Sequence, residues 1–133
     1  MSDNFLFELV SPEKKLASTE ANSILVPGIE GDFTALPNHS TFLTTLRPGI
    51  LTIYDKNGET KFIVTGGFVE ILDNMTTVLA EKSFPLNDFN HDQMSNMIDE
   101  AKEDLENCSE ESRSRLELRL NDFLVLSEII PKK

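Results

Sequence analysis

Apolar residues recur at every second position in parts of the first two thirds of the chain. At the start, Phe5, Phe7 and Leu9 occupy alternate positions of a segment that ends at Val10, which predicts an opening β-strand. Short apolar segments follow at 23–26, 41–46, 50–54, 60–65, 68–72 and 76–81, with turn residues between them. Repeated short strands with frequent turns predict a β-sandwich or a β-barrel.

The dipeptide Asn57–Gly58, between two of these segments, is the best short hairpin signal. A two-residue turn there would place Leu51 opposite Val64 and Ile53 opposite Phe62. All four apolar side chains would then share one face, which is an internal check on the register. The sequence therefore predicts a tight hairpin with this pairing.

Two other dipeptides lie between predicted strands. Gly66–Gly67 indicates a bulge or a close approach of two backbone segments. Asp73–Asn74 lies between two apolar segments and predicts a second hairpin.

After Pro85 the apolar period becomes helical. Asn90 and Gln93 are spaced for a capping box, and Phe89 and Met94 for a hydrophobic staple. Apolar residues then follow at helical spacing, at Met94, Met97, Ile98, Ala101, Leu105 and Cys108. These signals predict a helix.

A second helix is predicted after Ser109, which we expect to be its N-cap, with Glu110 and Glu111 at the positive end of its dipole. One apolar stripe is formed by Leu116, Leu120, Phe123 and Ile130, and the stripe is widened by Leu118, Leu124, Val125, Leu126 and Ile129. We expect the two helices to form an antiparallel hairpin. The broad apolar face would pack on the first helix and the β domain and leave area for a partner.

A shaped surface turn is predicted at 27–39. Its two glycines allow backbone angles that other residues avoid, and its two prolines fix theirs. This segment would present the polar side chains of Glu30, Asp32 and His39, and would be anchored inward by Ile29, Phe33 and Leu36. Shaped loops on a rigid scaffold are common functional sites.

Composition limits the functional classes. The chain has 133 residues, a length typical of one domain or of a small domain with an appendage. Its formal net charge is −11, and residues 86–130 alone contain 12 acidic and 4 basic residues. Such a chain is repelled by phosphate backbones and by anionic lipid, so we expect neither nucleic-acid binding nor direct adsorption to a membrane, and without a long apolar run no direct membrane insertion. The single cysteine and the absence of a signal-like or membrane-spanning segment predict a cytoplasmic protein.

No catalytic, metal or cofactor site is predicted. Cys108 lies on an apolar helical stripe, which is typical of a small buried hydrophobe. His39 and His91 lie in different halves of the chain, and no Cys/His spacing suits zinc. Glu30 and Asp32 are most simply solvated loop carboxylates, and the glycines match no phosphate-binding pattern. The residues by themselves thus indicate an acidic interaction protein.

Several segments together resemble the epsilon subunit of bacterial F-type ATP synthase in their order and spacing. They are FELVSPEK at 7–14, VPGIEGDF at 26–33, LPNH at 36–39, LTTLRPG at 43–49, GGFVE at 66–70 and VLAE at 78–81. The match covers essentially the whole β domain, and the helical hairpin follows where that family has one.

The resemblance implies a mainly β fold with added α structure: a two-layer β-sandwich over residues 1–85 and a two-helix antiparallel hairpin over residues 86–133. It also implies a non-catalytic rotor subunit in the central stalk, peripheral to the cytoplasmic side of the bacterial inner membrane. The sandwich would bind the gamma subunit and rest on the ring of c subunits. Glu30, Asp32 and His39 match the polar positions that face that ring, whereas Thr34 stands where the family commonly has glycine.

For the hairpin, the resemblance implies regulation. In the family the hairpin extends toward the alpha and beta subunits and restrains ATP hydrolysis, and in some members it binds ATP when folded. Here Ile98 and Asp99 match the start of the ATP-binding pattern, but Lys102 stands in place of arginine and Glu103 in place of alanine. Lysine does not replace arginine at a bidentate site. An ATP site with Ile98, Asp99 and Lys102 is therefore predicted to be weak.

Inhibition by the hairpin is likewise predicted to be weak or absent, because the tail is acidic and Glu111 is spaced to pair internally with Arg115. The alternative function is a stand-alone nucleotide sensor that binds ATP on the folded hairpin.

Overall fold

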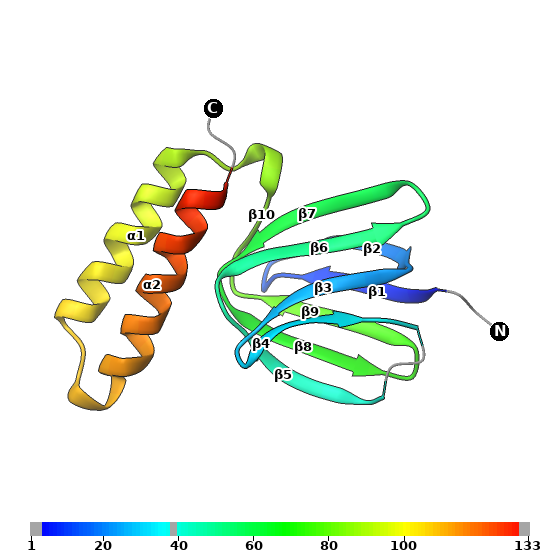
Figure 1. Cartoon of the computed structure of the whole chain (residues 1–133), viewed down its shortest axis with the longest axis horizontal. Helices are drawn as coiled ribbons and strands as arrows, with labels where there is room; N and C mark the ends of the chain where they lie inside the picture. The colour runs from blue at the N-terminus through cyan, green and yellow to red at the C-terminus, as the bar shows by residue number, and fades with distance from the viewer. Residues whose placement is uncertain (1–3, 38–39, 131–133) are drawn as a thin grey trace.

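The computed structural model describes residues 4–37 and 40–130, and within them the chain forms a curled β-sandwich followed by a helical hairpin (Figure 1). One layer contains β3 (Ser23–Gly28), β4 (Gly31–Ala35), β6 (Gly49–Asp55), β7 (Gly58–Val64) and β10 (Ser83–Pro85). The other contains β1 (Phe5–Val10), β2 (Lys15–Ala21), β5 (Phe42–Leu46), β8 (Gly67–Leu72) and β9 (Met75–Ala80). The predicted sandwich with a C-terminal two-helix hairpin is confirmed.

The two layers are parts of one continuous sheet that folds over on itself. The strand order is β10-β7-β6-β3-β5-β8-β9-β1-β2, and β4 pairs with the other edge of β3. A single residue pair, Gly28 with Leu46, joins β3 to β5 and so connects the layers. All strand pairs are antiparallel except β1 with β9.

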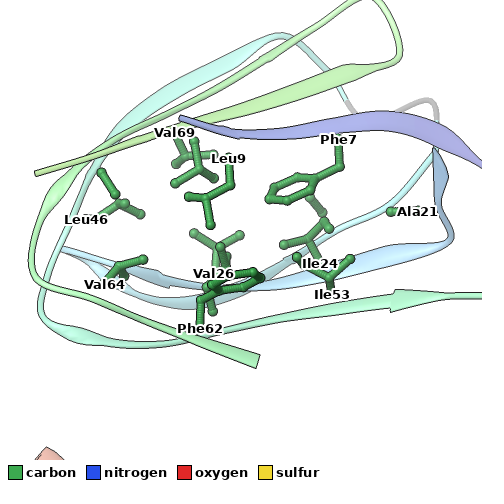
Figure 2. Packing of buried hydrophobic residues seen from close by; sticks show 14 of the residues in the cluster. Phe7, Leu9, Ala21, Ile24, Val26, Leu46, Ile53, Phe62, Val64 and Val69 are labelled. Carbon is green, nitrogen blue, oxygen red and sulfur yellow. The ribbon is translucent and has the colours of Figure 1, made fainter. Parts of the chain in front are cut away.

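The main core lies between the two layers. Phe7, Leu9 and Val69 project from one layer toward Ile24 and Phe62 of the other (Figure 2). Burial of each such side chain contributes about 1.5–3 kcal/mol relative to exposure. The period-two alternation at the start of the chain therefore has a direct cause, because Phe5, Phe7 and Leu9 all point into this core.

The β6–β7 hairpin forms, but its predicted pairing is wrong. Leu51 faces Phe62, and Asp55 faces Gly58, so the turn residues are Lys56 and Asn57. The Oδ1 atom of Asp55 accepts a hydrogen bond from the backbone N–H of Asn57 at 2.8 Å, and Gly58 follows with φ +114. This arrangement is typical of a turn closed by a glycine bulge, and it shifts the register by two residues. A shift of two keeps every side chain on its face, so the predicted buried residues were still correct.

The two other turn predictions are confirmed. Asp73 and Asn74 have φ of 45 and 62 and form the tight turn between β8 and β9. Gly67 has φ +133, and a Cβ atom there would overlap the carbonyl oxygen of Leu79 on the neighbouring strand. The paired glycines therefore permit a close approach of two backbone segments.

Two segments differ from the prediction. Strand β2 was missed, because its sequence KLASTEA is largely polar at the edge of its layer. The predicted loop at 27–39 begins instead as a tight β3–β4 hairpin, with β3 continuing through Pro27 to Gly28 and only Ile29 and Glu30 in the turn. Pro27 is tolerated there, although prolines are rare within sheets.

The helical hairpin consists of α1 (His91–Glu106) and α2 (Arg113–Ile129), with short 3₁₀ turns at Leu86–Asp88 and Glu110–Ser112. The predicted capping box is present: the Asn90 side chain accepts from the Gln93 N–H at 2.9 Å, and the Gln93 side chain accepts from the Asn90 N–H at 3.0 Å. A second core joins the hairpin to the outer face of the β6–β7 layer and contains Ile63, Phe89, Met94, Ala101, Phe123, Leu126 and Ile130.

The connection between the helices differs from the prediction. Cys108 lies beyond the end of α1 at Glu106, where it is half-buried and its thiol donates to the carbonyl of Leu105 at 3.1 Å. Ser109 precedes the 3₁₀ turn and not α2, which begins at Arg113. The expected Glu111–Arg115 pair is not among the salt bridges; Arg113 pairs with Glu117 at 3.2 Å instead.

Replacing Gly67 with alanine tests the close approach of β8 and β9. We expect Gly67→Ala to destabilise the chain by roughly 2–4 kcal/mol, because the added methyl group meets a backbone carbonyl at a left-handed position. Gly58→Ala is the matched control, because φ is also positive there but no atom lies within 4 Å of the added Cβ. The control should cost only about 1 kcal/mol in urea unfolding. Equal losses in the two variants would contradict this role of Gly67.

Candidate functional site: the β3–β4 turn and the surfaces around it

The turn between β3 and β4 is held in one shape by its neighbours. The Ile29 N–H donates to the Thr45 carbonyl at 2.9 Å, and the Arg47 N–H donates to the Pro27 carbonyl at 3.0 Å. A Cβ atom on Gly28 would lie 2.7 Å from the Gly31 carbonyl oxygen, so the strands approach closely here as well. These backbone contacts therefore fix the shape of the turn.

The polar residues predicted for this turn are placed as follows. Glu30 is exposed in the turn itself, and Asp32 is exposed at the start of β4. The Oδ1 atom of Asp32 lies 2.8 Å from Nη2 of Arg47, and this bond raises the pKa of Arg47. His39 lies outside the described residues.

The predicted apolar anchors of the segment are mostly wrong. Ile29 and Leu36 have exposed fractions of 51% and 53%. Phe33 does pack against the core, and its ring meets the Phe42 ring edge-on at 5.4 Å. The anchoring is done instead by backbone hydrogen bonds, which sequence periodicity does not reveal.

The residues of the predicted ATP site lie within one turn of α1 but differ in burial. Ile98 packs toward the second core, whereas Asp99 and Lys102 are exposed on α1. None of the three lines the small cavity of about 140 Å³ between the hairpin and the sandwich. Its ionisable lining residues are Glu81, Lys82, Glu100, Asp104 and Arg119, and the three carboxylates would repel phosphate groups. The weak ATP site stays a prediction without a structural observation in its favour.

No group of three His, Cys, Asp or Glu side chains that could hold a metal ion occurs within residues 4–37 and 40–130. In the same part of the chain, no helix is long and apolar enough to cross a membrane.

A large apolar surface covers the outer face of the β5-β8-β9-β1 layer, which we call the outer apolar face. Its exposed apolar members are Leu6, Leu43, Phe68, Leu72 and Leu79. Phe68 pairs directly with Leu79, and Leu79 with Val10, so these three residues form one apolar row across three strands. A polar row of Glu8, Thr77 and Glu70 separates it from a second apolar row of Leu6, Met75 and Leu72. A depression of about 220 Å³ lies beside them, lined by Val10, Pro12, Phe68 and Leu79 among others.

The sequence signal for the outer apolar face was present but was not used. In β8 the inward residues Val69 and Ile71 alternate with outward Phe68, Glu70 and Leu72, of which Phe68 and Leu72 are also large and apolar. A strand that is apolar on both faces predicts cover on both sides. Here the described residues of the chain supply cover on one side only.

Arg119 joins the helical hairpin to the sandwich. Its Nη1 donates to the Thr65 carbonyl at 2.9 Å, and its Nη2 lies 3.4 Å from Oε1 of Glu81. The guanidinium also lies 5.1 Å from the centroid of the Phe123 ring. Sequence analysis did not identify this contact, because 54 residues separate Arg119 from Thr65.

Comparison with known proteins identifies the family. Residues 4–85 match the family model described as ATP synthase, Delta/Epsilon chain, beta-sandwich domain. The chain is 38% identical to the ATP synthase epsilon chain of Rhizobium rhizogenes over 99% of each protein. The chain belongs to the ATP synthase epsilon family. It is also 45% identical to the ATP synthase epsilon chain of a Ruegeria species, over 77% of this chain and 74% of that relative.

Solved structures agree in fold. A chain in the cryo-EM structure of the Euglena gracilis mitochondrial ATP synthase (OSCP/F1/c-ring) matches with a TM-score of 0.76, covering 98% of this chain and 84% of that one, at 21% identity. A chain in the central stalk/c-ring structure of the Tetrahymena thermophila mitochondrial enzyme matches with a TM-score of 0.56 and 26% identity, covering 66% and 71%. As an epsilon-family member, the chain is a non-catalytic central-stalk subunit of an ATP synthase.

Removing the Arg119 guanidinium should loosen the hairpin. We expect Arg119→Met to lower the free energy of unfolding by about 1–3 kcal/mol, because it removes a charge-assisted hydrogen bond and leaves the Thr65 carbonyl without this donor. Hydrogen exchange of the α2 backbone should accelerate more than that of the sandwich core. Arg115→Met, on an exposed position of the same helix, is the control. If both variants behave alike, Arg119 does not hold the hairpin in place.

Proposed function

We propose that this chain joins the gamma shaft of the rotor to the c-subunit ring, with residues 1–85 carrying both contacts and residues 86–133 forming a regulatory hairpin. The observation that carries the proposal is the outer apolar face, which the described part of the chain leaves exposed although the other layer is covered by the hairpin. A subunit with one apolar face and one polar projecting turn can bind an apolar surface of one partner and a polar surface of another.

The gamma contact is assigned to the outer apolar face. Large contiguous apolar patches are rare on monomeric proteins and mark interaction sites. Phe68 is 51% exposed and lies beside an almost wholly apolar depression, so it has the position and size of an interface anchor. Exposed Glu20 pairs with Leu6 from the neighbouring edge strand β2, as expected for the polar rim of an interface.

The c-ring contact is assigned to Glu30 and Asp32, with His39 as a further member by prediction. Two exposed carboxylates on a stiff turn fit a basic polar loop on the partner. Stiffness matters because a rotor must transmit torque through this contact, and the backbone hydrogen bonds of the turn supply it.

The hairpin is proposed to restrain ATP hydrolysis weakly or not at all. Its exposed surface carries about half of the acidic residues of the chain, among them Asp92, Asp99, Glu103 and Glu106 on α1. Such a surface disfavours a stable contact with acidic segments of the alpha and beta subunits. The same charge argues against a nucleotide sensor. We place the complex at the cytoplasmic side of a bacterial inner membrane, by analogy with its bacterial relatives.

The gamma assignment is tested by Phe68→Ala. Affinity for the purified gamma subunit should fall at least about tenfold, because truncation removes the anchor of the apolar face. Stability should change little, since about half of the side chain is already exposed. Leu124→Ala is the control, an exposed leucine on α2 outside this face. Loss of gamma binding in the control and not in Phe68→Ala would move the gamma site to the hairpin.

The c-ring assignment is tested by Glu30→Gln and Glu30→Lys. Binding of the chain with gamma to vesicles that contain c rings should weaken by about two- to tenfold in the first variant and further in the second, more so at low salt. Glu13→Gln removes an exposed charge from the β1–β2 turn and should leave binding unchanged. Tighter binding of Glu30→Lys would show that the turn meets an acidic partner instead.

A further inference from the structure

Arg47, at the corner between β5 and β6, forms hydrogen bonds with both strands of the β3–β4 hairpin. Its backbone N–H donates to the Pro27 carbonyl, and its guanidinium bonds the Asp32 carboxylate at 2.8 Å. Pro27 and Asp32 are cross-strand partners, so one residue fastens the hairpin at a single level just below its turn. The Ile29 amide, bonded to Thr45 on the strand before Arg47, reports on the same attachment.

A carboxylate of the helical hairpin faces the same guanidinium. Asp122 of α2 lines a groove of about 450 Å³ between α2 and the sandwich, together with Asp32 and Arg47. Partial burial raises the pKa of Asp122, the charge of Arg47 lowers it, and the charge of Asp32 raises it. Asp122 forms no salt bridge within 4.0 Å among the described residues. The helical hairpin thus holds an acid that is attracted to Arg47 and repelled by Asp32.

We propose that Arg47 is a positioning residue for the β3–β4 turn, and that Asp122 competes with Asp32 for its guanidinium. The docked hairpin then loosens the turn slightly, and a partner cation that engages Asp32 frees Arg47 for Asp122 and tightens hairpin docking. Such coupling is reciprocal by thermodynamic necessity.

Arg47 is the cation placed to serve both acids. Its planar guanidinium has five N–H donors, so it can turn from one carboxylate to the other without leaving the groove. The other cation lining the groove is Lys61, whose Nζ lies 3.7 Å from Glu59 on its own strand. The two acids come from segments 90 residues apart, and they are neighbours only while the hairpin is docked.

The meaning of this coupling for rotation rests on the proposed c-ring contact, but the coupling itself does not. It is measured on the full chain alone, without gamma or c ring. If the Glu30 variants do not weaken c-ring binding, the coupling between Arg47 and Asp122 can still be present. If the coupling is absent, the c-ring binding result is unaffected.

The test is a double-mutant cycle read by NMR-detected hydrogen exchange at the Ile29 amide. Asp122→Asn should slow this exchange about two- to fivefold, because Asp122 then no longer competes with Asp32 for the Arg47 guanidinium. In an Arg47→Gln background the same substitution should have less than about half of that effect on a logarithmic scale. Reciprocally, Asp32→Asn should slow exchange in α2 around residues 122–126.

The experiment has two controls. Glu128→Gln removes an exposed charge from α2 outside the groove and should leave the Ile29 exchange unchanged. The core amide of Val69 serves as a reference for global stability in every variant. The proposal is overturned if Asp122→Asn leaves the Ile29 exchange rate unaltered, accelerates it, or alters it equally with and without Arg47.

Discussion

The structure depends on one constraint: a ten-stranded sheet has two faces, and folding it over on itself buries only one of them. The inner faces meet in the core that contains Phe7, Leu9 and Phe62. Each layer is left with an outer face that is partly apolar. On the β6–β7 side the chain covers that face with its own helices, through Ile63, Phe89 and Phe123. On the β8–β9 side the described residues supply no cover, and Phe68 and Leu79 remain half exposed.

This asymmetry connects the fold to its place in the ATP synthase. An exposed apolar sheet face is typical of an interaction site, as expected for a subunit of a larger assembly. The polar turn between β3 and β4 offers the opposite chemistry, with carboxylates and hardly any apolar area apart from Ile29. The two surfaces lie on different layers of the sandwich.

The corner where the two layers join brings the functional features together. Gly28 pairs with Leu46 there, and Arg47 follows immediately with its contacts to Pro27 and Asp32. Because α2 packs over the adjacent outer face, Asp122 reaches the same corner. The turn, the sheet junction and the helical hairpin thus meet at Arg47, and this shared contact is the basis of the proposed coupling.

The sequence by itself determined which segments become strands or helices, apart from β2, β4 and β10, and which face of each predicted element is buried. These properties follow from local periodicity and turn chemistry: the alternation of Phe5, Phe7 and Leu9, the left-handed turn at Asp73 and Asn74, and the capping box at Asn90. The motifs were also specific enough to indicate the epsilon family, which the comparisons show.

Only the tertiary structure decided the features that depend on distant segments. The β6–β7 register was set by the Asp55 side chain and the positive φ of Gly58, because shifts of two residues bury the same side chains and periodicity cannot separate them. The pairing of Asp32 with Arg47, the contact of Arg119 with Thr65 and the approach of Asp122 to the corner join residues far apart in sequence. Local patterns carry no information about such contacts, since the curl of the sheet and the docking of the helices create them.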